Sequence, residues 1–255
     1  MVQKRTLDQI DIYDHDLYKN LNLPLIDLAI DIVARNNTRF TVFPNSKGIA
    51  RIINLLEWQA HAYHEYLDGD GIFVDQIVHI ALHQAVDTLT GGRHPEGALL
   101  AEAFASASDL YLLGNIAKTG EETDFVVDTM ESLGSYYEMY ADGETGLNAL
   151  LEQLLADPFQ TMINVADYLM QFCQPLLYSG SVPEITDEIQ RLEQNGFYPL
   201  VHHYNTTNWI LTIRSQYPQW YPDPVGVGTI KKRLSQSETH FLGCIREVVL
   251  GLHEA

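Results

Sequence analysis

Cysteine is scarce in this sequence: only Cys173 and Cys244 occur among 255 residues, and they form no CxxC pair. Two cysteines this far apart exclude a disulfide framework and a paired-thiol redox or metal motif. We therefore expect reduced thiols in the core of a cytoplasmic protein. No base lies near Cys173 in the sequence, which argues against a thiol nucleophile.

Basic residues are also few, because 15 lysines and arginines stand against 34 aspartates and glutamates. The resulting net charge of −19 repels phosphate backbones and anionic lipid surfaces. Nucleic acid and membranes are therefore not expected as partners. The same negative charge favours the binding of cations, whether metals, amines or a basic protein surface.

Long apolar runs are missing, and no segment approaches the roughly 18 residues that cross a bilayer. The first residues, "MVQKRTLDQIDIYDHD", contain no apolar stretch followed by a cleavage site, so we expect no signal peptide. With 46% hydrophobic and 19% charged residues, the composition is typical of a folded globular chain.

Apolar residues recur mostly at helical spacing along the chain, so the sequence predicts an all-α fold. We expect one domain over residues 1–255, with a multi-helix core bundle at about 47–178 and a C-terminal elaboration at about 179–255. Helices are predicted at about 7–20, 24–34, 47–67, 73–89, 95–118, 121–140, 147–155, 158–178, 183–195 and 228–253. Residues 197–228, rich in aromatics and proline, are predicted to be irregular, either a cap over the bundle or a surface crossing that packs its own aromatics.

Histidine and acidic residues concentrate in residues 54–87, on two predicted helices that flank the turn "DGDG". Antiparallel neighbours place residues equally far from a turn at the same height. By this count His61 is level with His79, Glu57 with His83, and Glu65 with Asp75. Within each helix these residues follow i, i+4 spacing and share one face.

The predicted helix at 95–118 adds Glu102 and Asp109, which are the only charges in its run "ALLAEAFASASDLYLLG". A carboxylate on an apolar helix is costly to bury unless it is paired or bound to a metal. Glu102 lies about as far after the turn "GGRHPEG" as His83 lies before it. We expect one layer with His61, His79, Asp109 and Glu131, and a second with Glu57, His83, Glu102 and Glu138.

Imidazole and carboxylate inside a helical bundle are ligands for non-haem iron, manganese or zinc. The sequence lacks the Glu-x-x-His repeat of di-iron bundles and any His-Glu-x-x-His motif. A solvated polar face explains much of the same pattern, because Lys47, Arg51 and Asn54 lie on the stripe of His61.

The leading hypothesis is a metal-dependent enzyme, a non-haem iron oxidase or oxygenase acting on a small, partly apolar molecule. Its predicted metal ligands are His61, His79, His83, Glu102 and Glu57, with Glu65 and Asp109 as catalytic or orienting carboxylates. The alternative is a non-catalytic helical protein that binds a small ligand or a protein partner. Homo-oligomerisation is left open.

Overall fold

The computed structural model describes residues 3–43, 51–52, 64–91, 94–179, 185–217 and 226–252. The chain divides into two compact units. The first comprises Met1–Arg93 and Gly228–Ala255, and the second comprises His94–Val227. The single domain expected from the sequence stays a prediction, and each unit is described by itself.

The first unit contains two small sheets. A four-stranded sheet has the order β1-β3-β5-β4, with β1 at Gln3–Arg5, β3 at Arg39–Phe43, β5 at His64–Asp68 and β4 at Arg51–Ile52. Strands β3 and β5 are parallel, and the two outer pairs are antiparallel. A second, parallel pair joins β2 (Asp11–Tyr13) to β6 (Gly71–Phe73).

The first unit also contains the helices α1 (His15–Asn20), α2 (Pro24–Arg35), α3 (Val74–Thr90), α11 (Val227–Leu234) and α12 (Glu238–Leu250), with a 3₁₀ turn at Leu7–Gln9. α2 packs against α3, and α12 packs against both. α3 begins directly after β6, so the chain passes from a buried strand into the helix without a loop.

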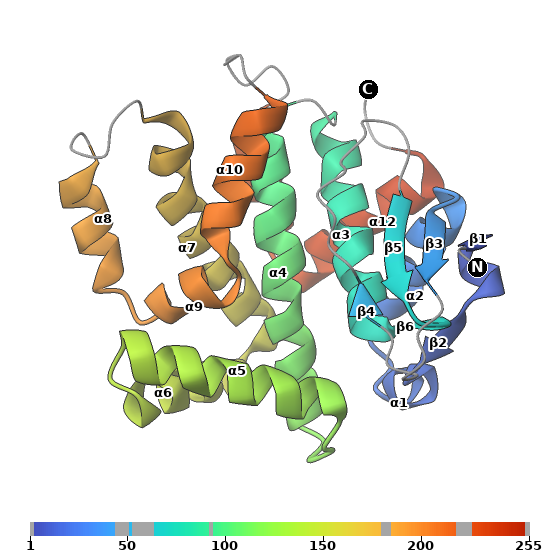
Figure 1. Ribbon diagram of the computed structural model, residues 1–255, viewed down its shortest axis with the longest axis horizontal. Helices are drawn as coiled ribbons and strands as arrows, with labels where there is room; N and C mark the ends of the chain where they lie inside the picture. The colour runs from blue at the N-terminus through green and yellow to red at the C-terminus, as the bar shows by residue number, and fades with distance from the viewer. Residues whose placement is uncertain are drawn as a thin grey trace. The chain divides into compact units, whose positions relative to one another are not determined.

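The second unit is helical and is built on α4 (Pro95–Ala117) and α7 (Pro158–Tyr178), which pack along each other. α5 (Asp124–Tyr140) and α6 (Glu144–Ala156) lie across one end of this pair, as Figure 1 shows. A methyl group added at Gly114 would come within 2.9 Å of the Leu154 carbonyl oxygen, which explains why glycine stands at this contact.

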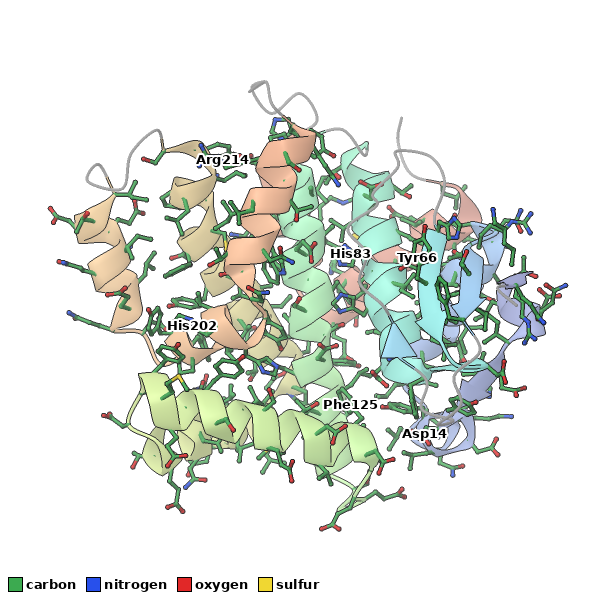
Figure 2. All side chains as sticks on the ribbon, viewed as in Figure 1. Asp14, Tyr66, His83, Phe125, His202 and Arg214 are labelled. Carbon is green, nitrogen blue, oxygen red and sulfur yellow. The ribbon has the colours of Figure 1, made fainter. Side chains whose placement is uncertain are left out.

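The aromatic segment of the second unit is more ordered than predicted. It forms α9 (Tyr198–His203) and α10 (Thr206–Gln216), which follow α8 (Thr186–Glu193). Asn205 takes a left-handed conformation (φ 51°), which separates α9 from α10. The predicted aromatic cluster is present: His202, labelled in Figure 2, stacks on Tyr140 with ring centroids 3.7 Å apart.

The predicted all-α, multi-helix fold is confirmed, with twelve α-helices and only short strands in the described residues. In that part of the chain, none of the helices combines the length and the apolar character needed to cross a bilayer.

Three of the predicted helices are wrong in their extent. Residues 7–20 form a 3₁₀ turn, a strand and a short helix. Of the helix expected at 47–67, residues 47–50 and 53–63 lie outside the described residues, and the described parts are strands at Arg51–Ile52 and His64–Asp68. The final helix is interrupted, because Ser237 caps a new helix by accepting a hydrogen bond from the His240 amide.

Candidate metal centre

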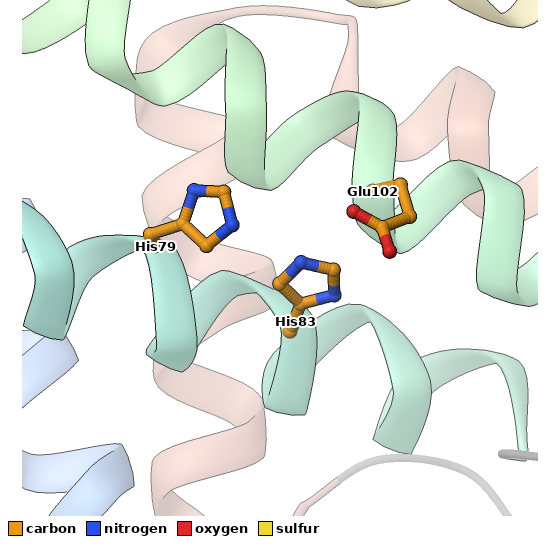
Figure 3. Close-up of side chains that lie close together, drawn as sticks. All are labelled: His79, His83 and Glu102. Atoms are coloured by element: carbon orange, nitrogen blue, oxygen red, sulfur yellow. The ribbon is translucent and has the colours of Figure 1, made fainter. Parts of the chain in front are cut away.

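His79 and His83 lie one turn apart on α3, and Figure 3 shows both rings projecting from the same side of that helix. Their ring centroids are 5.0 Å apart. Ile80, between them in sequence, is only 4% exposed and belongs to the buried face. The helix therefore holds the two imidazoles as a pair, because residues at i and i+4 share one side.

Glu102 lies in the middle of α4, whose residues are buried on every side. Its own exposure is 8%, so its carboxylate has little access to water. Within the second unit it is close enough to Cys173 of α7 to raise the pKa of that thiol. A carboxylate this deep in an apolar helix needs a cationic partner or a metal, because its desolvation is otherwise uncompensated.

His79, His83 and Glu102 each offer one ligand atom, and these atoms lie within 4.8 Å of one another (Figure 3). This is the one group of three such residues found in the part of the chain that the structure describes. Zinc ligands at about 2.0–2.2 Å from the ion stand about 3–4 Å apart.

Glu65 is the second carboxylate of interest, and it lies on β5, not on a helix as predicted. Successive strand residues alternate between faces, so Glu65 shares a face with Leu67, which is fully buried. Phe40 of β3 is its partner in register and is also fully buried. The carboxyl group therefore sits on the apolar side of the sheet.

This position changes the acidity of Glu65. Desolvation by burial raises the pKa of Glu65 to about 7, and the nearby charge of His79 opposes part of that rise. The electrostatic interaction shows that Glu65 lies close to a histidine of the candidate centre. A carboxyl group that exchanges its proton near neutral pH has the acidity that acid–base catalysis requires.

The other predicted site residues lie elsewhere. Glu57 and His61 lie outside the described residues. Asp109 faces the C-terminal aromatic segment, where its charge acts on His203 and Tyr204. Glu131 and Glu138 are exposed on α5. The two predicted layers stay a prediction, because two of their members lie outside the described residues.

The sequence contains a signal for the grouping of the two histidines. His79 and His83 are separated by three residues on one helix, a spacing that allows both imidazoles to reach a single ion without any partner from the neighbouring helix. The sequence indicates the position of Glu65 near His79 more weakly, because that position depends on the pairing of β5 with β3. No protein-family model, curated protein or solved structure matches this chain.

The two cysteines are expected to be inert in the folded protein. Burial raises the pKa of Cys173 to about 12, and Glu102 adds to this rise. The pKa of Cys244 is also raised by burial. Iodoacetamide at pH 8 should therefore leave Cys173 unmodified in the native protein and label it in denaturant. Rapid native labelling of Cys173, detected by peptide mass spectrometry, would show that the thiol is accessible and ionised.

Proposed function

We propose that this protein is a metal-dependent enzyme in which His79, His83 and Glu102 bind one divalent metal ion. The observation that carries the proposal is the approach of their three ligand atoms to within 4.8 Å. Two imidazoles from one helix and one carboxylate form a three-ligand set, which leaves a coordination position for water or substrate.

Zinc is the metal that this donor set favours. Two histidines at i and i+4 on one helix, completed by a glutamate, form the ligand set of zinc-dependent hydrolases. A zinc ion bound in this way lowers the pKa of a coordinated water, which supplies a nucleophile at neutral pH. The chemistry best supported is therefore hydrolysis.

The chain departs from the common hydrolase motif at one position. In His-Glu-x-x-His the residue after the first histidine is the general base, whereas here that residue is the buried Ile80. Glu65 is the carboxylate proposed for this role, because the charge of His79 acts on it and burial raises its pKa to about 7. We assign Glu65 as the group that accepts the proton of the attacking water.

Iron is the second candidate metal. Two histidines and one carboxylate with open positions also form the ligand set of non-haem iron(II) oxygenases. That chemistry activates dioxygen and does not require a neighbouring proton acceptor, so the position of Glu65 favours the hydrolytic assignment.

The substrate class follows from the charge and the composition of the chain. The net charge of −19 disfavours polyanions, so the proposed substrate is a small neutral or cationic molecule. A cytoplasmic location is part of the proposal. Self-association is left to measurement.

Metal content and hydrolysis, measured on the same preparation, test the function. Protein purified without a histidine tag is expected to carry about one zinc per chain by elemental analysis. Dialysis against a chelator should remove both the metal and the hydrolysis of 4-nitrophenyl acetate, and added zinc should restore both. Iron(II) loading with oxygen uptake in place of ester hydrolysis would favour the oxygenase assignment. A chain that carries neither metal as purified and takes up neither zinc nor iron when they are added would favour the non-catalytic binding protein.

A further inference from the structure

A cavity of about 480 Å³ opens in the second unit, where the C-terminal end of α7 meets the start of α8. Its volume is within the range of small-molecule pockets. The lining side chains include Gln171, Gln174, Tyr178 and Glu188. Among the described residues that line it, none is a lysine, an arginine or a histidine. The described part of the lining therefore offers hydrogen-bond acceptors and no cationic group.

Pro175 increases this excess of acceptors. It lies inside α7 and has no N–H, so the carbonyl oxygen of Gln171 lacks the donor that a regular helix would give it. Both residues line the cavity. The last carbonyl groups of α7 point the same way along the helix axis and add partial negative charge at this end.

Two further polar residues of the lining, Gln174 and Glu188, strengthen the preference for a cation. Gln174 donates a hydrogen bond from Nε2 to Glu96 at 2.9 Å, which leaves its carbonyl oxygen as an acceptor. Glu188 contributes a full negative charge from the first turn of α8. Asp187 and Glu188 already complement the positive end of that helix, so an anion would meet like charge in this position.

We propose that this cavity binds an aliphatic primary ammonium group, with a short carbon chain lying against Pro175, Tyr178 and Ile185. An ammonium group has three donors and no acceptor, which matches a lining of carbonyl, amide and carboxylate oxygens. The proposal is independent of the metal centre, because none of the residues in it is a proposed ligand.

Calorimetric titration with 1,4-diaminobutane tests the proposal, with 1,4-butanediol as a neutral molecule of the same length. We expect saturable binding of the diamine at 0.15 M salt and none of the diol. Amide NMR shifts should change most at Gln174, Ser179 and Glu188. Diamine binding with shifts spread over the acidic surface, equal binding of the diol, or preferential binding of acetate would each overturn the proposal.

Two variants separate a built site from general attraction to an acidic protein. Glu188→Gln should weaken diamine binding about threefold to fivefold, as expected for the loss of one exposed charge. Glu152→Gln makes the same charge change at an exposed position of α6, the helix that precedes the N-terminal end of α7. This control variant should bind the diamine as tightly as the unaltered protein.

Pro175→Ala tests the carbonyl of Gln171. Alanine restores the helical N–H, so the melting midpoint should rise while diamine binding weakens. A higher melting midpoint with unchanged diamine binding would show that the carbonyl oxygen of Gln171 does not accept a hydrogen bond from the ammonium group. That result would overturn the part of the proposal that rests on Pro175.

Discussion

Replacement of Glu102 by glutamine is expected to reduce the metal affinity more than about 100-fold, beyond what the loss of an outer-sphere partner costs. The amide keeps the shape of the side chain in the buried middle of α4 and removes its charge. His79 and His83 alone give a two-ligand site, which cannot hold zinc in tetrahedral geometry with one open position. Competition with a chromophoric chelator gives the affinity directly.

The melting midpoint of the metal-free variant separates the alternatives for Glu102. If the carboxylate is only a buried partner of a histidine, its loss leaves metal content unchanged and costs about 3–5 kcal/mol of unfolding free energy. Glu152→Gln, on the exposed side of α6, should alter neither quantity. Unchanged metal loading of Glu102→Gln would remove this residue from the proposed centre.

Long periodic segments could be predicted from the sequence. α2, α3, α4 and α7 begin and end within a few residues of the predicted bounds, because each combines a long run rich in apolar residues, periodic in all but α4, with a terminal signal. Pro24, Pro95 and Pro158 stand in the first turn of three of them. Proline is tolerated there because the first N–H groups have no partner inside the helix.

β3 lies in the run "NNTRFTVFPNSKG", which is the most strand-like piece of the sequence. The other strands could not be predicted in the same way. The run "HEYLD" of β5 is five residues long, and its spacing fits the end of a helix as well as a strand. Its conformation is decided by pairing with β3, which lies more than twenty residues earlier in the chain. The segment Asp11–Tyr13 is likewise extended because it pairs with Gly71–Phe73. Such non-local pairing leaves little local signal.

The candidate centre was predictable in its residue types and only partly in its grouping. Counting from turns predicts Glu102 level with His83; this height stays a prediction, and both residues belong to the group of proposed ligands. The same count predicts His79 in a different layer, because it assumes a helix where β5 lies. It also predicts Glu65 as a helical neighbour of Asp75, whereas Glu65 lies on β5, where the charge of His79 acts on it.

Glu65→Gln is expected to lower the rate of hydrolysis about 10²–10⁴-fold in zinc-loaded protein, the usual contribution of a positioned proton acceptor. The amide preserves the size of the side chain on β5 but cannot accept a proton from water. Metal content should stay near that of the unaltered protein, because Glu65 is not among the three proposed ligands.

The pH dependence of the rate distinguishes this role from a supporting one. A carboxylate that accepts the proton makes the rate rise with pH as it ionises, and this limb should disappear in Glu65→Gln. If Glu65 instead orients His79 by accepting its ring N–H, the variant should bind zinc about 10–100-fold more weakly and keep the same pH profile at saturating metal. A fully loaded variant with an unchanged rate would leave the attacking water without an assigned base, and the hydrolytic assignment would give way to the iron alternative.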